Sequence, residues 1–214
     1  MKSALLTTVA LGALCFGGAV QAASMHTRVF TSSGTFTIPS DAKPAQEFLF
    51  TVVGGGGGGG GCGSDEVFVA SGGAGANGFA SFSGFSASDT VTITVGAGGS
   101  AGGSASNGGN GGTSKATYSS TDIVGATGGT GSHTDSIVPG AAGAFSATAG
   151  STGLTLQASL NYGAQDGGTS VFSDEASGTA WLPGGSNAFG SVGTPTHLAG
   201  TTGGAGAIIV TWVQ

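Results

Sequence analysis

The sequence predicts an all-β protein in which a bundle of polyglycine II helices, arranged as a sandwich, lies beside a small β-sheet. Three observations predict this fold class. Eight consecutive glycines, Gly54–Gly61, directly follow the apolar run Phe48–Val53. Glycine then recurs at every third position along much of the chain. Outside the N-terminal 22 residues no apolar period of 3.6 residues has a useful length, so we expect essentially no α-helix.

The composition excludes several classes of protein. Of the 214 residues 47 are Gly, and only 7% are charged. Disordered chains are usually rich in charge and poor in large apolar residues, whereas this chain contains 12 Phe. The formal net charge of −6 leaves few cations to neutralise phosphates. We therefore expect an ordered chain that does not bind nucleic acid.

The N-terminus has the pattern of a secretory signal peptide. A short positive region is followed by the apolar stretch Ala4–Val20 and by Val20-Gln21-Ala22, which fits the small-x-small cleavage rule. A membrane anchor is the alternative, but this stretch is shorter and richer in Ala and Gly than a spanning helix of about 20 residues. We expect a signal peptide over residues 1–22 and a single glycine-rich domain over residues 23–214. The mature chain is then secreted or held at the cell surface, without membrane insertion.

Short apolar and alternating segments predict the strands. Residues 28–38 alternate β-branched, aromatic and small polar side chains, which suggests two strands that turn near Ser32–Gly34. Val91–Val95 alternates with period two and predicts another strand. The other predicted strands are Phe48–Val53, Gly78–Phe85 and Ala207–Val213. Because the chain begins and ends in strands, we expect a small sheet formed from both ends.

The glycine period predicts rods that pack against one another. From Gly96, steps of three give Gly99, Gly102, Ala105, Gly108 and Gly111. A polyproline-II-type helix has three residues per turn and rises about 3.1 Å per residue, so every third residue lines one edge. Only glycine at that edge lets two backbones touch. The helix has no internal hydrogen bonds, so its buried amides must pair with neighbouring rods. Collagen shares the period but needs more Pro and an unbroken repeat.

The interruptions of the glycine pattern predict loops that join successive rods, and loops on a rigid scaffold often carry binding residues. These loops are residues 63–71, 115–124, 132–139, 152–162, 169–183 and 195–198. The candidate binding residues within them are Tyr118, His133, Asp135, Tyr162, Phe172, Trp181 and His197. The aromatic members are suited to stack on sugars or to plug the ends of the bundle, and both interpretations stay open.

The order of the motifs resembles a known family. The motifs are Val29–Pro39, Phe50–Gly57, Val91–Gly99, Gly111–Ser114 and Gly206–Trp212. Over about residues 28–213 the chain resembles the glycine-rich domain of bacteriophage tail-fibre tip adhesins and of related secreted bacterial proteins. The resemblance implies a polyglycine II sandwich beside a β part, with receptor-binding loops at one end. The signal peptide departs from the phage proteins and favours an exported bacterial protein.

No catalytic or metal-binding motif stands in the context that it requires. Gly98–Gly102 matches the nucleophile-elbow string, which needs a strand-turn-helix. The G-x-G-x-x-G matches within Gly54–Gly61 precede no predicted helix. The histidines lack ligand spacing, and the acidic pairs Asp65-Glu66 and Asp174-Glu175 lack the calcium-repeat pattern. We expect no enzymatic activity, no metal and no cofactor. With Cys15 in the leader, Cys62 is the single cysteine of the mature chain.

Our leading hypothesis is a secreted, non-enzymatic, adhesin-like protein that binds a cell-surface carbohydrate or protein through its inter-rod loops. One alternative is a structural subunit of an extracellular filament or matrix. It would self-associate through the edge strands Val29–Phe36 or Ile208–Val213. A second alternative is an ice-binding protein with flat Thr, Ala and Ser faces, but against it the outward positions lack a regular Thr ladder.

Overall fold

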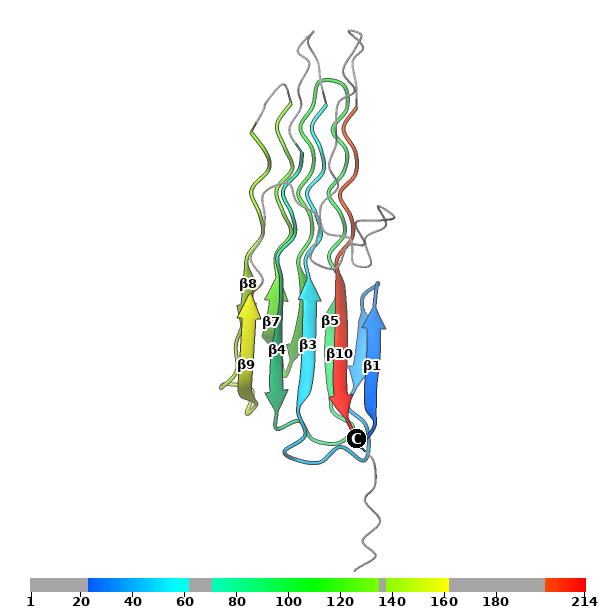
Figure 1. Cartoon of the computed structure of the whole chain (residues 1–214), viewed down its shortest axis with the longest axis vertical. Coiled ribbons are helices and arrows are strands. Elements are labelled where there is room, and N and C mark those ends of the chain that lie inside the picture. Colours follow the sequence, from blue (N-terminus) through cyan, green and yellow to red (C-terminus); the bar gives the residue numbers. More distant parts are fainter. Residues whose placement is uncertain (1–22, 62–70, 135–137, 162–198) are drawn as a thin grey trace, which may run out of the picture.

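The computed structural model describes residues 23–61, 71–134, 138–161 and 199–214. This part of the chain consists of antiparallel β-strands and of extended glycine-rich segments that continue from them, and it contains no helix. It accordingly offers no helix that is long and apolar enough to cross a membrane. The strands lie at one end of the molecule and the glycine-rich segments at the other (Figure 1).

The first sheet, sheet A, joins strands from both ends of the chain with strands from its middle. Its strand order is β1-β10-β3-β4-β9, with all neighbours antiparallel. Ser24 and Gln214, just outside β1 and β10, exchange both backbone hydrogen bonds at 2.8 Å. The predicted pairing of the two chain ends is therefore confirmed. The strands of sheet A are β1 (Met25–Phe30), β3 (Phe48–Val53), β4 (Asn77–Ser83), β9 (Thr155–Asn161) and β10 (Ala207–Val213).

The second sheet, sheet B, has the order β2-β5-β6-β7-β8 and is also antiparallel. A two-residue turn, Ser119-Ser120, joins β6 to β7. Both serines have positive φ, 46° and 64°, which is the backbone that a tight type I′ hairpin turn requires. The strands of sheet B are β2 (Gly34–Thr37), β5 (Thr90–Thr94), β6 (Ser114–Tyr118), β7 (Thr121–Ala126) and β8 (Phe145–Ala147).

The β part is larger than the sequence predicted. The strands expected in residues 28–38, 48–53, 78–85, 91–95 and 207–213 are all present. Residues 115–124 and 152–162, however, were predicted as loops between rods, and they contain β6, β7 and β9. That prediction was wrong because these strands use small and polar residues, with only a few large apolar side chains facing inward. Ala116, Ile123 and Val124 supply the burial for the hairpin, each at most 1% exposed.

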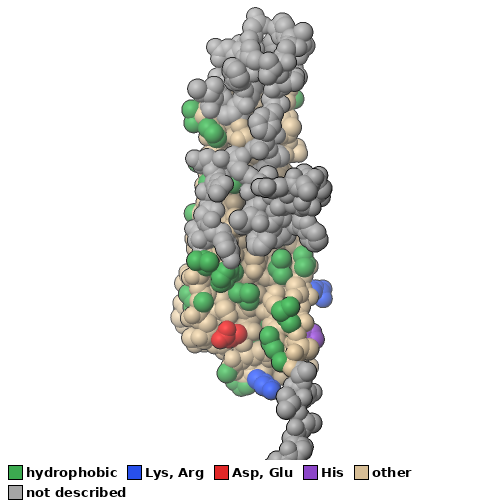
Figure 2. Space-filling model, viewed as in Figure 1, with side chains coloured by type: hydrophobic (Ala, Val, Ile, Leu, Met, Phe, Trp, Pro, Cys, Tyr) green, Lys and Arg blue, Asp and Glu red, His purple; other side chains and the backbone are tan. Residues whose placement is uncertain are grey.

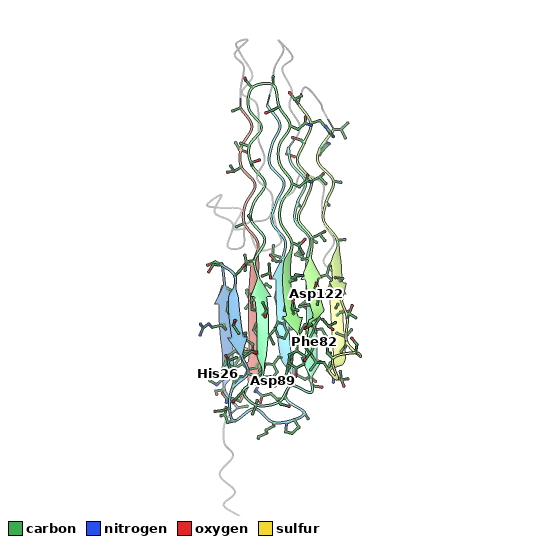
Figure 3. The ribbon with its side chains drawn as sticks, turned by 180° about the vertical axis from the view of Figure 1, so that it is seen from behind. His26, Phe82, Asp89 and Asp122 are labelled. Carbon is green, nitrogen blue, oxygen red and sulfur yellow. The ribbon has the colours of Figure 1, made fainter. Side chains whose placement is uncertain are left out.

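Phenylalanine fills the space between the two sheets. Phe48, Phe50 and Phe82 are at most 1% exposed, and Phe82 is seen among the strands in Figure 3. The ring of Phe36, from sheet B, meets Phe48 and Phe50 of sheet A edge-on, with centroids 6.1 and 6.4 Å apart. Such edge-to-face pairs add about 0.5–1.5 kcal/mol each beyond the burial of area. The strand end of the molecule is thus a side-chain core between two sheets.

Beyond the strands, the same two layers continue as glycine-rich rods. We call these rods together the glycine bundle, and its described rods are residues 54–61, 71–76, 96–102, 106–113, 127–134, 138–144 and 199–206. Three of them extend β3, β4 and β10 of sheet A, and the others extend β5 to β8 of sheet B. In Figure 1 the rods run side by side away from the arrows of their strands.

The rod Gly54–Gly61 occupies the middle of the bundle. Each of its eight amides has a hydrogen-bond acceptor. Gly54 and Gly57 donate to rod 71–76, Gly55, Gly58 and Gly61 to rod 106–113, and Gly56 and Gly59 to rod 199–206. Gly60 donates to the Ser132 hydroxyl of rod 127–134. From Gly54 to Gly59 the partner therefore rotates with a period of three residues, which is the expectation for polyglycine II packing, although that designation stays a prediction. A flexible linker would leave these amides to water.

Glycine is required along this rod because neighbouring backbones lie where a Cβ would be. A Cβ built on Gly54 would lie 2.2 Å from the Thr127 carbonyl oxygen, and one on Gly58 would lie 1.9 Å from the Ser100 oxygen. The same holds on the rods around it, for example at Gly111, 2.2 Å from the Gly55 oxygen. The phased glycines are therefore the contact surfaces of the rods.

Candidate binding surfaces of the glycine bundle

Rods end at the extremity that lies away from the strands, where the turn Gly103–Ser106 joins two of them. We call this extremity the tip and define it by Gly61, Gly103–Ser106 and Thr134. The Gly61 amide donates to the Ser106 carbonyl at 2.9 Å, and the Thr134 hydroxyl donates to the Gly61 carbonyl at 2.6 Å. Ser106 also closes its own turn, since its Oγ accepts from the Gly103 amide at 2.6 Å. Three rod ends are thus tied together here.

The tip and the described chain ends lie at opposite ends of the molecule. Ser24 and Gln214 pair at the far end of the strands, which we call the base (Figure 1). Gly61 and Thr134, the last described residues before residues 62–70 and 135–137, both lie at the tip, and those connecting residues lie outside the described part of the chain. The described turn Gly103–Ser106 therefore lies at one extremity, and Ser24 pairs with Gln214 at the other.

One broad side of the bundle carries a regular array of Ala, Ser, Thr and Asn side chains, with one His. Its members are spaced three residues apart on neighbouring rods, and all are exposed. They include no Asp, Glu, Lys or Arg. We call this array the outer face, and it consists of Ala97, Ser100, Asn107, Asn110, Thr113, Thr127, Thr130, His133, Ala141 and Ala144.

Hydrogen bonds to the next rod hold several of these side chains in place. Asn107 and Asn110 accept from the amides of Thr134 and Gly131, at 2.8 and 2.9 Å. Thr127 and Thr130 do the same for the next rod, accepting from the amides of Ala144 and Ala141 at 2.7 and 2.6 Å. Each of these four amides is thus paired with a side chain instead of water. The outer face is consequently rigid as well as regular.

The predicted binding residues do not gather in one place. His133 is exposed on the outer face, next to the tip. Tyr118 lies at the opposite end, in β6, where its ring meets Phe85 edge-on at 5.1 Å between centroids. The interpretation of its segment as an inter-rod loop was wrong. The other five predicted residues, Asp135, Tyr162, Phe172, Trp181 and His197, lie outside the described residues.

The titratable groups with shifted pKa values belong to sheet B. The Tyr118 hydroxyl donates to the Asp89 carboxylate at 2.5 Å, and this bond, followed by burial, raises the tyrosine pKa. Asp122 accepts from Lys115 at 2.8 Å and from Thr117 at 2.6 Å, and these bonds, the Lys115 bond first, lower its pKa. Figure 3 places Asp89 and Asp122 among the strands, away from the rods. Among the described residues no group of three or more potential metal ligands occurs.

A groove of about 970 Å³ at the base was not predicted from the sequence. The connection before β3 forms one wall with Asp41, Lys43 and Glu47, and Leu49 and Thr211 of sheet A also line it. Two hydrogen bonds hold this wall, from Ser81 to Glu47 at 3.1 Å and from Gln46 to the Val213 carbonyl at 3.0 Å. The connection before β3 is polar and has neither the glycine period nor a recognisable motif. The sequence therefore gave no indication of this groove.

The fold defines a class of protein: a two-sheet β-sandwich whose strands run on into glycine-rich rods joined through their backbones. The sequence model of one family, described as a glycine-rich domain, matches residues 31–212. The chain belongs to this glycine-rich domain family. The match includes the described rods and both described sheets, apart from β1 and the last residue of β10, Val213. The search of the curated proteins returned no match.

Proposed function

We propose that this protein is a secreted, non-enzymatic surface protein that binds a carbohydrate or protein of a cell surface through the tip. One observation carries the proposal, namely the separation of the tip from the paired chain ends at the base. A protein that is displayed or tethered through the base holds its tip outermost. Binding residues are commonly found on loops that a rigid scaffold positions.

The chemistry of the tip supports a hydroxyl-rich ligand. Ser104, Ala105 and Ser106 are exposed in the turn between two rods, and Thr134 and His133 lie on the neighbouring rod. These hydroxyl, imidazole and backbone groups are both donors and acceptors of hydrogen bonds, as sugar hydroxyls are. The rods are held by backbone hydrogen bonds, so little conformational freedom is lost on binding.

The test compares two exposed alanines in turns at opposite ends of the molecule, Ala105 at the tip and Ala87 at the base. Residues 23–214 are labelled and applied to a glycan array and to intact bacterial cells. Ala105→Arg should abolish the binding seen with the unaltered protein, because the long side chain covers the tip. Ala87→Arg should retain it. The proposal fails if the unaltered protein binds nothing, or if the two variants behave alike.

A second candidate function, ice binding, is favoured by the outer face. Rigid groups at regular spacing present water with an ordered template, and the hydrogen bonds of Asn110 and Thr130 hold that template in place. The matched pair is Thr113→Lys on the outer face and Thr92→Lys on β5, both at exposed threonines. Thermal hysteresis should be present in the unaltered protein and should be lost only in Thr113→Lys. Absence of hysteresis in the unaltered protein rejects this candidate.

A further inference from the structure

The described sheets have four edge strands, and three of them carry features that discourage pairing with another chain. The edge strands are β1 and β9 of sheet A, and β2 and β8 of sheet B. β2 has four residues and β8 has three, and β9 has an irregular register against β4. Short strands and bulges are the usual protection of sheet edges. β1, by contrast, has six residues in unbroken register with β10.

The backbone groups that β1 leaves unpaired follow from its register. Ser24 and Gln214 exchange both hydrogen bonds, so residues 26 and 28 also bond to β10 in the antiparallel alternation. The amides and carbonyls of Met25, Thr27 and Val29 therefore point away from β10, toward the open edge. The earlier prediction of Ile208–Val213 as an edge was wrong, because β10 lies between β1 and β3.

Two of the same three residues, Met25 and Val29, give this edge exposed apolar side chains. Met25 is 74% exposed and Val29 is 53% exposed. Val213, which faces Met25 in the register, is 54% exposed. Figure 2 shows hydrophobic side chains spread over the strands on the face of the molecule turned toward the viewer. Arg28, the charged residue of this strand, holds its guanidinium over the Phe30 ring, 5.6 Å from the ring centroid.

We propose that β1 is the interface for a second copy of this chain, which pairs with it antiparallel about a two-fold axis at Thr27. The sequence of the edge is self-complementary in this register. Thr27 faces Thr27 of the other copy, and each Met25 faces a Val29, so apolar side chains meet apolar side chains. Each outward amide and carbonyl of Met25, Thr27 and Val29 gains a partner. Opposite residues on the same face lie close enough for direct contact, and a two-fold interface of this kind closes as a dimer.

The dimer has a consequence for the arrangement of the tips. Antiparallel pairing of β1 directs the two glycine bundles toward opposite ends of one continuous assembly. Sheet A becomes a single sheet that crosses both copies. The inference goes beyond the proposed tip binding and does not depend on it, because its test measures association and not ligand binding.

The first experiment measures the mass of residues 23–214 by light scattering after size exclusion. The unaltered protein should have the mass of a dimer. Thr27→Pro should show a twofold fall in mass, since proline removes an amide that points to the edge and leaves the bonds to β10 intact. Thr27→Lys provides a second variant, because two like charges would face each other. Circular dichroism checks that both variants are folded.

Val29→Lys and Leu160→Lys are a matched pair on the two edge strands of sheet A, at apolar residues 53% and 49% exposed. Only Val29→Lys should dissociate the dimer. A monomeric unaltered protein, a dimer that persists in folded Thr27→Pro and Thr27→Lys, or dissociation by Leu160→Lys alone would each overturn the proposal. Assemblies larger than a dimer would overturn the closed two-fold arrangement and favour a filament.

The second experiment tests the register, in a Cys62→Ser background. Opposite residues of an antiparallel pair have Cα atoms about 5.5 Å apart, within the range of a disulfide. Thr27→Cys should therefore form a covalent dimer on oxidation, whereas Val29→Cys alone should not. A mixture of Met25→Cys and Val29→Cys should form a heterodimer. Equal crosslinking of Thr27→Cys and Val29→Cys would overturn the proposed register.

Discussion

The two ends of this molecule are held together by opposite means. In the sandwich, side chains such as Phe50 separate two sheets that bond only within themselves. In the glycine bundle, the backbones of the two layers bond directly, as in the contacts from Gly55 to Gly112 and from Gly73 to Thr130. Packed sheets usually stand about 10 Å apart, so the removal of side chains lets the layers close and bond. The change occurs between Val53 and Gly54.

The comparison shows that a hydrophobic core and a hydrogen-bonded core respond to opposite changes. A side-chain core is damaged when atoms are removed and a cavity is left. A backbone core is damaged when atoms are added, because the neighbouring chain already fills the space. The following substitutions test this contrast, with the free energy of unfolding measured by chemical denaturation of residues 23–214.

Removal of a buried ring should cause the largest loss. Phe50→Ala takes away a fully buried side chain that contacts Phe36 and Phe82 at ring-centroid distances of 6.4 and 6.1 Å. The expected loss of unfolding free energy is about 3–5 kcal/mol. Phe50→Leu, which keeps most of the volume, should lose much less. Similar losses for both variants would mean that the site tolerates a cavity.

Addition of a single methyl group to the rod Gly54–Gly61 should lower the free energy of unfolding nearly as much as Phe50→Ala does. The Cβ of Gly58→Ala would overlap the Ser100 carbonyl oxygen, and both rods are fixed by hydrogen bonds. We expect a loss of about 3 kcal/mol, at the upper end of overpacking. Gly34→Ala is the control, because its nearest neighbour is 4.0 Å away in Phe30, and it should change stability by less than about 1 kcal/mol. A harmless Gly58→Ala would contradict the backbone core.

Loss of one hydroxyl at the junction should have an intermediate effect. Ser114 is fully buried, and its Oγ accepts from the Gly96 amide at 2.9 Å where β5 and β6 pass into rods. Ser114→Ala leaves that amide without an acceptor, at a cost of about 1–3 kcal/mol. Ser104→Ala, at an exposed position in the tip, should leave stability unchanged. Hydrogen exchange should be faster at Gly96 in Ser114→Ala, and an unchanged rate would show that another acceptor replaces the hydroxyl.

Substitution of the asparagines of the outer face should lower the free energy of unfolding less, because water can replace their side-chain oxygens as hydrogen-bond acceptors. Asn110→Ala removes the acceptor of the Gly131 amide and should cost about 1 kcal/mol or less. Asn110→Asp keeps the acceptor oxygen and should retain most of the stability. Hydrogen exchange at Gly131 should accelerate only in the alanine variant. Equal exchange rates in both variants would show that the amide is already open to water.

The smallest effect should be the pH dependence due to Asp122. Its folded pKa is lowered, first by Lys115 and then by Thr117, so its contribution is present above the unfolded-state pKa and is lost as pH falls through the folded pKa. The Asp122 side chain is 51% exposed, and exposed pairs are worth at most about 1 kcal/mol. Asp122→Asn should be slightly less stable than the unaltered protein at pH 7 and equal to it in strong acid. A difference that persists in acid would contradict the ion pair.

The sequence allowed the strands with large apolar residues and the phased glycines to be predicted, because both have a period that one chain displays by itself. Phe48–Val53 and Ala207–Val213 were predicted with the bounds that the structure has. The hairpin of β6 and β7 was missed, since Ser119-Ser120 replaces the usual Asn-Gly or Asp-Gly of such turns. The outer face was missed for a different reason. Asn110 and Thr130 align only when neighbouring rods are placed in register, and a single sequence does not contain that register.

The rotation of hydrogen-bond partners along Gly54–Gly61 limits how such a protein changes its length. An insertion of one or two residues in a rod would turn every later amide toward the wrong neighbour, whereas three residues restore the phase. Rods in contact must also lengthen together. Otherwise the backbone amides and carbonyls of an added turn would have no hydrogen-bond partners on the neighbouring rods. Related chains are therefore expected to differ by multiples of three within their rods, in matched sets. Their tip turns are free to differ by any number.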